Sequence, residues 1–221
     1  MTTASLRRLA PALLVVPLLA AFAGGWAAIT VEDLPDQVTV GRPVSLEFAV
    51  RQHGVTPLTG LEPRVEAQGP GAPVRAAAVP GGAAGHYRAA ITLPAPGDWT
   101  ITIHSGFGKS RVTLLPIAAV APGAAPVTLT AAERGRRLFV AKGCVSCHLH
   151  RGVEGSGMQE VGPELTERPL APDYLARYLA DPSISKSNRS RGAGAMPDLD
   201  LDQNEIAALV AFLGGSRQAT R

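Results

Sequence analysis

The stretch Gly143-Cys-Val-Ser-Cys-His-Leu-His150 (GCVSCHLH) decides how the second half of the chain folds. It contains both cysteines of the 221 residues, Cys144 and Cys147, and His148 follows them directly. Two thiols and an imidazole at this spacing allow four interpretations: a simple disulfide, a thiol redox pair, a zinc site, and covalent haem attachment through Cys-x-x-Cys-His.

The surroundings of the motif favour haem attachment. A redox pair requires a strand before its first cysteine, whereas a predicted helix precedes Cys144. Zinc requires four ligands held apart in a tetrahedron, and the cysteines and histidines of this stretch lie too close together in sequence to enclose an ion. Two thiols three residues apart can reach both vinyl groups along one porphyrin edge, which leaves the imidazole of His148 beneath the ring as an iron ligand.

The composition limits what the rest of the chain can be. Hydrophobic residues make up 46% of it, which rules out a mostly disordered protein. A chain of this length suits one large or two small domains, and we predict two. The formal net charge is +3, of which Arg7 and Arg8 supply two. The remainder is near neutral, so a nucleic-acid partner has no electrostatic support.

Residues 1–23 predict an export signal. Arg7 and Arg8 precede an uncharged run, residues 9–29, and Ala21-Phe22-Ala23 has the small-x-small form that a signal peptidase accepts. The uncharged run is also long enough to span a bilayer, so a retained N-terminal anchor is the rival interpretation. Either way, we expect the rest of the chain in the periplasm or at the extracytoplasmic face of the membrane.

Residues 24–117 predict an all-β domain. Apolar and polar residues alternate in Val44-Ser-Leu46-Glu-Phe48-Ala-Val50, and again around Trp99, Ile101 and Ile103. Turn clusters such as Val79-Pro-Gly-Gly82 separate about seven such runs, which is typical of a small antiparallel sandwich.

Two short motifs in this region carry a resemblance. Gly85-His-Tyr87 and Pro94-x-x-Gly97-Asp-Trp99-Thr-Ile101 resemble the immunoglobulin-like FixH or YtkA-type domains of exported bacterial proteins. Exported domains of this type are sometimes associated with copper, and His53, His86 and His104 fall here. The region has no cysteine, and its only possible methionine is Met1 in the predicted signal. A soft ligand set for copper is therefore missing. We therefore expect surface histidines and no tight copper site.

The C-terminal part changes character to all-α. Residues 118–128 are rich in Ala, Pro and Gly and predict a semi-rigid linker before a domain at 129–221. Thr130-Ala-Ala-Glu133 is a capping box that opens the first helix. The three predicted helices cover about 130–142, 173–180 and 202–213. The loops between them are too long for a compact bundle unless something large fills its centre.

Residues 129–221 resemble a class I cytochrome c domain, with Cys-x-x-Cys-His directly after the first helix. Gly135 and Phe139 match the family positions where the first helix crosses the last, and Phe212 matches the aromatic residue of the last helix. Val161-Gly162-Pro163-Glu-Leu165 matches the family's Gly-Pro segment. The resemblance implies that the Pro163 carbonyl accepts a hydrogen bond from the ligand histidine, which fixes the ring orientation.

The resemblance also implies a second iron ligand. Met196 falls where the family places its axial methionine, and a thioether favours ferrous iron and fills the last coordination position. His150 is a poor rival because one intervening residue cannot carry the chain across a porphyrin, and Met158 precedes the Gly-Pro segment. A charged loop before Met196 could contact haem propionates or simply be solvated. The candidates in that loop are Asn188, Arg189 and Arg191.

The predicted function is an exported mono-haem c-type cytochrome that carries electrons, with one covalently attached haem c. The β domain would dock it to a membrane complex or position it. Expected partners are a redox donor and acceptor, with a membrane respiratory complex favoured and a membrane surface as a further candidate. The alternative is a copper-handling or redox-sensing interaction protein with haem as an accessory. An enzyme would need an open iron position, which Met196 argues against.

Overall fold

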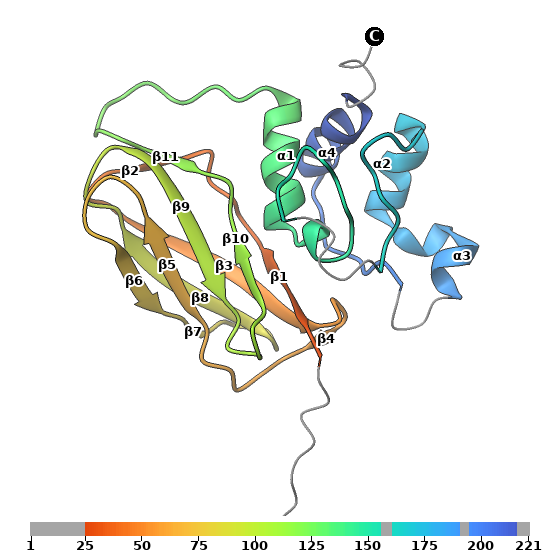
Figure 1. Cartoon of the computed structure of the whole chain (residues 1–221), viewed down its shortest axis with the longest axis horizontal. Coiled ribbons are helices and arrows are strands. Elements are labelled where there is room, and N and C mark those ends of the chain that lie inside the picture. Colours follow the sequence, from red (N-terminus) through yellow and green to blue (C-terminus); the bar gives the residue numbers. More distant parts are fainter. Residues whose placement is uncertain (1–24, 156–160, 191–194, 216–221) are drawn as a thin grey trace, which may run out of the picture.

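The computed structural model describes residues 25–155, 161–190 and 195–215 (Figure 1). An N-terminal β domain is followed by a helical domain, which confirms the predicted two-domain architecture. Three of the predictions made above lie outside the described residues: the export signal at 1–23, the rival ligand Met158 and the loop residue Arg191. Within the described ranges, no helix is long and apolar enough to cross a membrane.

The β domain is a sandwich of two sheets. One has the strand order β1-β3-β8-β7 with β4 paired to β3, and the other has the order β2-β11-β9-β5-β6 with β10 paired to β9. The strands are β1 Ala27–Val31, β2 Gln37–Thr39, β3 Pro43–Gln52, β4 Thr56–Pro57, β5 Arg64–Gln68, β6 Val74–Ala77, β7 Val79–Pro80, β8 His86–Thr92, β9 Gly97–His104, β10 Arg111–Thr113 and β11 Ile117–Val120.

The alternation seen in the sequence matches the burial of the long strands. On β9, Trp99, Ile101 and Ile103 are fully buried while the residues between them are not. About seven strands were predicted, and the described part of the domain has eleven, of which four are only two or three residues long. Strands that short contain too few residues to show a period of two, so the sequence pattern missed them.

The segment predicted as the start of the linker is a strand instead. Ile117–Val120 forms β11, which pairs antiparallel with β9 and parallel with β2. Ile117 and Ala119 are buried in the sandwich, and this burial outweighs the weak local preference of an Ala-rich segment. The connection without regular structure therefore begins at residue 121 and reaches α1 (Figure 1).

The helical domain has the three predicted helices and one short additional helix. Its elements are α1 Ala131–Ala141, the 3-10 turn η1 Cys144–Ser146, α2 Pro172–Ala180, the 3-10 turn η2 Pro182–Ile184, α3 Lys186–Arg189 and α4 Gln203–Gly215. The predicted capping box is present, because the amide of Glu133 donates to the Thr130 hydroxyl and the Glu133 carboxylate accepts from the Thr130 amide. α3 has four residues, too few to show a helical period.

Helices α1 and α4 cross at Gly135, as the sequence predicted. A Cβ atom added to Gly135 would lie 2.0 Å from the carbonyl oxygen of Ala208, so only glycine allows this approach. One turn further on, the rings of Phe139 and Phe212 lie 5.8 Å apart. Phe139 of α1 and Leu209 and Leu213 of α4 line the cavity described next.

Candidate functional site

A tight turn after α1 presents the Cys-x-x-Cys-His motif. Gly143 has φ of 76°, a left-handed conformation that favours glycine. The carbonyl oxygen of Cys144 then accepts hydrogen bonds from the amides of Cys147 at 3.1 Å and His148 at 2.9 Å. This turn brings the two thiols and the imidazole to the lining of one cavity, which Met196 also lines.

The two thiols do not have the properties of a redox pair. Both cysteines are free rather than joined in a disulfide. Burial raises the pKa of the Cys144 thiol to about 12 and also raises the pKa of Cys147. A thiol that exchanges disulfides needs a lowered pKa, because the thiolate is the nucleophile. The burial of the two thiols therefore argues against thiol–disulfide exchange at this site.

His148 is oriented by the segment that contains Pro163. Its Nδ1 atom lies 2.9 Å from the carbonyl oxygen of Pro163, and because a carbonyl only accepts, this contact assigns the proton to Nδ1. Nε2 is then the ring nitrogen that has a lone pair for a metal. A Cβ atom on Gly162 would lie 2.4 Å from Cε1 of His148. The Gly-Pro pair thus fits the histidine as the sequence predicted.

Met196 is held by the side chain of Asn188, which is 7% exposed. Oδ1 of Asn188 accepts from the Met196 amide at 2.7 Å, and Nδ2 donates to the Met196 carbonyl at 3.1 Å and to the Pro182 carbonyl at 3.2 Å. Asn188 also lines the cavity, but the hydrogen-bond partners of its side chain are these backbone groups. It therefore positions the methionine segment, a role that the sequence reasoning missed because no local pattern links α3 to Met196.

The other propionate candidate within the described residues is Arg189. Arg189 is not among the residues that line it, and its guanidinium donates to the carbonyl of Ser183. Two cationic residues that the sequence reasoning passed over do line the cavity: Lys142 and Arg168. Arg168 lies in an irregular segment, where no periodicity could have indicated its direction.

His150 packs inside the domain and is not among the cavity-lining residues. It is 3% exposed, and its ring lies 4.4 Å from that of Phe212 and 5.8 Å from that of Phe139. Burial lowers its pKa. It therefore supports the α1–α4 crossing, in agreement with its rejection as an iron ligand.

The β domain contributes residues to the same cavity. Ala28 and Thr30 of β1 and the turn residues His53 and Gly54 after β3 all line it. His53, expected as a surface histidine, is exposed but stands at this cavity, where its ring makes an edge contact with Trp26 at 5.7 Å. The sequence reasoning missed these residues because the contact joins two domains.

The other two β-domain histidines lie elsewhere and pair with carboxylates. His86 is 3.1 Å from Glu32, and His104 is 3.8 Å from Glu66. Within the described ranges, no group of three or more His, Cys, Asp or Glu residues is arranged to hold a metal ion. The predicted lack of tight copper binding stays a prediction.

Comparison with known families assigns the helical part. Residues 130–213 match the family model described as cytochrome C oxidase, cbb3-type, subunit III. This match supports a cytochrome c-like domain in the C-terminal part of the chain. A cytochrome c domain implies covalently bound haem c and an electron-carrying role, as the sequence predicted. The β domain lies outside this match, and its resemblance to FixH or YtkA-type domains stays a prediction.

Other comparisons add little to this assignment. No curated protein matches the chain. Among solved structures, domains 4 and 5 of the S-layer protein SbsC are 21% identical over 42% of this chain, with a TM-score of 0.34. The match spans about half of that structure, 51%. The Lin-41 filamin domain is 15% identical over 44% of this chain and 93% of its own length, with a TM-score of 0.35.

The residues of the cytochrome c domain fit haem c. Two thiols, an imidazole oriented through Nδ1 and a thioether line the same cavity. Apolar side chains complete the lining, which suits a large flat ring with low polarity. These apolar residues include Phe139, Leu165, Leu175, Leu179, Leu209 and Leu213.

Proposed function

We propose that the chain is an exported mono-haem c-type cytochrome that carries electrons and has no catalytic activity of its own. Cys144 and Cys147 bind the haem covalently, and His148 and Met196 are the axial ligands of its iron. The observation that supports this most strongly is the shared cavity, to which both sulfur-bearing segments and the Pro163-oriented imidazole contribute.

The protein groups around the haem have separate tasks. When bound, the haem supplies one-electron chemistry at its iron. The Pro163 carbonyl holds the proton on Nδ1 of His148 and so raises the basicity of the ligand nitrogen. Asn188 holds the backbone of Met196 on both sides. Arg168, at the cavity lining, is our candidate for a propionate partner in addition to the loop residues.

A closed coordination sphere suits a carrier better than a catalyst. If His148 and Met196 both hold the iron, no position would be left at which oxygen or peroxide could bind. We therefore propose a redox donor and acceptor as the partners, with a membrane respiratory complex as the favoured acceptor or donor. The β domain, which lies against the haem cavity, positions the haem relative to such a partner.

Intact-mass measurement of the natively expressed protein tests attachment, haem number and export together. The expected mass corresponds to the chain without residues 1–23 plus one haem, because Ala21-Phe22-Ala23 has the small-x-small form that a signal peptidase accepts and the sequence contains one Cys-x-x-Cys-His. Retention of residues 1–23 in a membrane-bound species would instead favour the anchor. A mass without haem would contradict the proposed function.

Asn188→Ala should weaken the Met196 ligand without removing it. Loss of a buried side chain that makes three hydrogen bonds leaves backbone groups unpaired, at a cost of about 1–3 kcal/mol. We expect a lower thermal midpoint, a weaker sulfur-to-iron charge-transfer band in the ferric protein and a lower potential. The matched control is Ser190→Ala, an exposed neighbour that should leave all three unchanged. Equal behaviour of the two variants would refute the positioning role of Asn188.

A further inference from the structure

β1 is buried on both of its faces. Ala27, Ile29 and Val31 point into the core of the sandwich, and the residues between them, Ala28 and Thr30, line the cavity of the cytochrome c domain. A strand at the edge of its sheet normally keeps one face or edge toward water. Complete burial of all five residues indicates that the helical domain covers the outer face of β1.

The β domain approaches two segments that would hold the haem: the attachment segment at Gly143–Cys144 and the methionine segment at Met196–Pro197. A Cβ atom on Gly143, the residue before Cys144, would lie 2.9 Å from the carbonyl oxygen of Ile29. A Cβ atom on Gly54 would lie 3.5 Å from Cγ of Pro197, the residue after Met196. The β domain therefore contacts both the attachment segment and the methionine segment.

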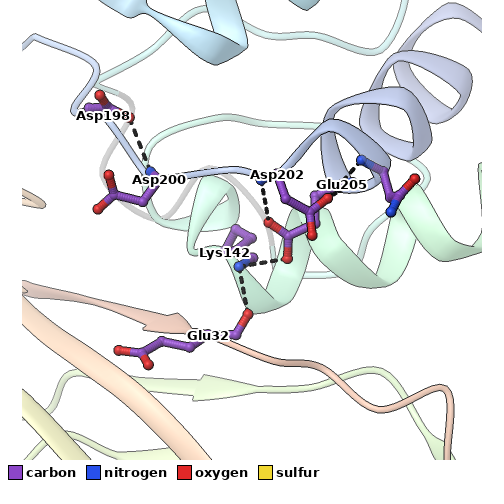
Figure 2. Close-up of polar contacts among 7 residues, drawn as sticks. Glu32, Lys142, Asp198, Asp200, Asp202 and Glu205 are labelled. Carbon is purple, nitrogen blue, oxygen red and sulfur yellow. Dashed lines mark hydrogen bonds and ion pairs between the residues drawn. The ribbon is translucent and has the colours of Figure 1, made fainter.

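Lys142 joins the two domains beside this contact. Its Nζ atom donates to the carbonyl oxygen of Glu32, just after β1, at 2.7 Å and pairs with the Glu205 carboxylate at 2.7 Å (Figure 2). The Lys142 and Glu205 side chains are only 5% and 12% exposed. Glu205 in turn accepts from the Asp202 amide in the cap of α4. One buried ammonium thus connects β1, the end of α1 and the start of α4.

This position is unusual for a lysine. An ammonium group loses its hydration when it is buried, and the loss is large unless charged and hydrogen-bonding partners replace the water. Here Glu205 supplies the charge and Glu32 supplies a backbone carbonyl from the other domain. Separation of the domains would therefore leave the ammonium without one of its partners, which favours the docked arrangement.

We propose that Lys142 is a positioning residue that locks the β domain onto the haem cavity, so that β1 and the Gly54 turn form a permanent wall of the haem site. A redox partner must then reach the haem from a side that the β domain does not cover. The inference rests on the proposed function, because the wall is defined relative to the haem.

Nuclear magnetic resonance of the full-length holoprotein can test the wall in solution. Paramagnetic ferric iron shifts the resonances of nuclei near it, so comparison of the ferric and ferrous forms reports which residues are close to the haem. In the parent protein we expect iron-dependent shifts at Ala28, Thr30 and Gly54, as well as at Gly162 beside His148. Arg75, on β6 at the far sheet, should show none.

The positioning role of Lys142 is tested by the double variant Lys142→Met with Glu205→Gln. This double variant removes both charges together, so no buried charge is left unpaired, and glutamine can keep the capping box. The iron-dependent shifts at Ala28, Thr30 and Gly54 should fall by roughly twofold or more as the domains move relative to one another. The shifts at Gly162 should persist. The single variant Lys142→Arg keeps the positive charge, so it should lose only part of the iron-dependent shifts.

Arg134→Ala is the matched control. It breaks another contact between the domains, the 2.7 Å pair with Asp36, but Arg134 does not line the cavity, so the shifts should stay as in the parent. If the double variant does not fold, Thr30→Trp, which pushes the two domains apart from the β side without changing charge, should cause the same loss of shifts at Ala28 and Gly54.

The outcomes separate this inference from the proposed function. Shifts at Gly162 without shifts at Ala28, Thr30 and Gly54 in the parent would overturn the wall and leave the haem site intact. Parent-like shifts in the folded double variant would overturn the role of Lys142. Absence of shifts at Gly162 itself would overturn the haem site and this inference with it.

Discussion

Met196→Ala should lower the midpoint potential of the haem by on the order of 0.2 V, a part of the roughly 0.8 V range that axial ligands set. The thioether sulfur is a soft ligand that favours the ferrous iron, and alanine cannot replace it. The sulfur-to-iron charge-transfer band of the ferric protein should disappear at the same time. A spectroelectrochemical titration of the parent and the variant measures both effects in one sample.

The fold of this variant should largely persist. Two thioethers and His148 would still hold the haem, and the hydrogen bonds between Asn188 and residue 196 involve only the backbone of that residue, so they survive the substitution. The matched control is Met158→Ala, which removes the other methionine of the C-terminal part and should leave potential and band unchanged. If Met158→Ala loses the band while Met196→Ala keeps it, the ligand assignment is wrong.

Replacement of both Cys144 and Cys147 by alanine should make the haem extractable. Thioether bonds survive acidified acetone, whereas a haem held only by His148, Met196 and apolar contacts does not. We expect the haem retained after extraction to fall by roughly tenfold or more. The thermal midpoint should also fall as haem is lost, because a ligand that binds only the folded state stabilises it.

Single replacements serve as controls for this pair. Cys144→Ala and Cys147→Ala each keep one thioether, so each should retain haem through extraction, with the haem spectrum slightly shifted. Covalently retained haem in the double variant would mean that the attachment involves other residues and would remove the basis for a c-type site.

The features of the helical domain that the sequence indicated without a structure are those with short, sterically strict motifs. The spacing of Cys144, Cys147 and His148 follows from the size of a porphyrin edge, so the motif can be recognised from the sequence alone. Gly135 and Gly162 stand where any Cβ atom would collide with backbone or ring. Such positions tolerate one residue type, and this strictness is what makes a motif specific.

The parts that the sequence did not predict depend on contacts between distant segments. Lysine is almost never fully buried, so nothing local indicates that Lys142 is 4% exposed and bridges two domains. Gly54 and Ala28 reach the cavity only because β1 docks on the helical domain. Asn188 was predicted only as a propionate candidate in the loop before Met196, and its hydrogen bonds to Met196 depend on the unpredicted helix α3.

Carbon monoxide binding by the ferrous parent protein tests the central claim most directly. The account predicts that His148 and Met196 occupy both axial positions, so the spectrum of the reduced protein should not change when carbon monoxide is added at neutral pH, while Met196→Ala should bind it. Stoichiometric binding of carbon monoxide by the parent would show an open iron position and contradict the assignment of this protein as an electron carrier.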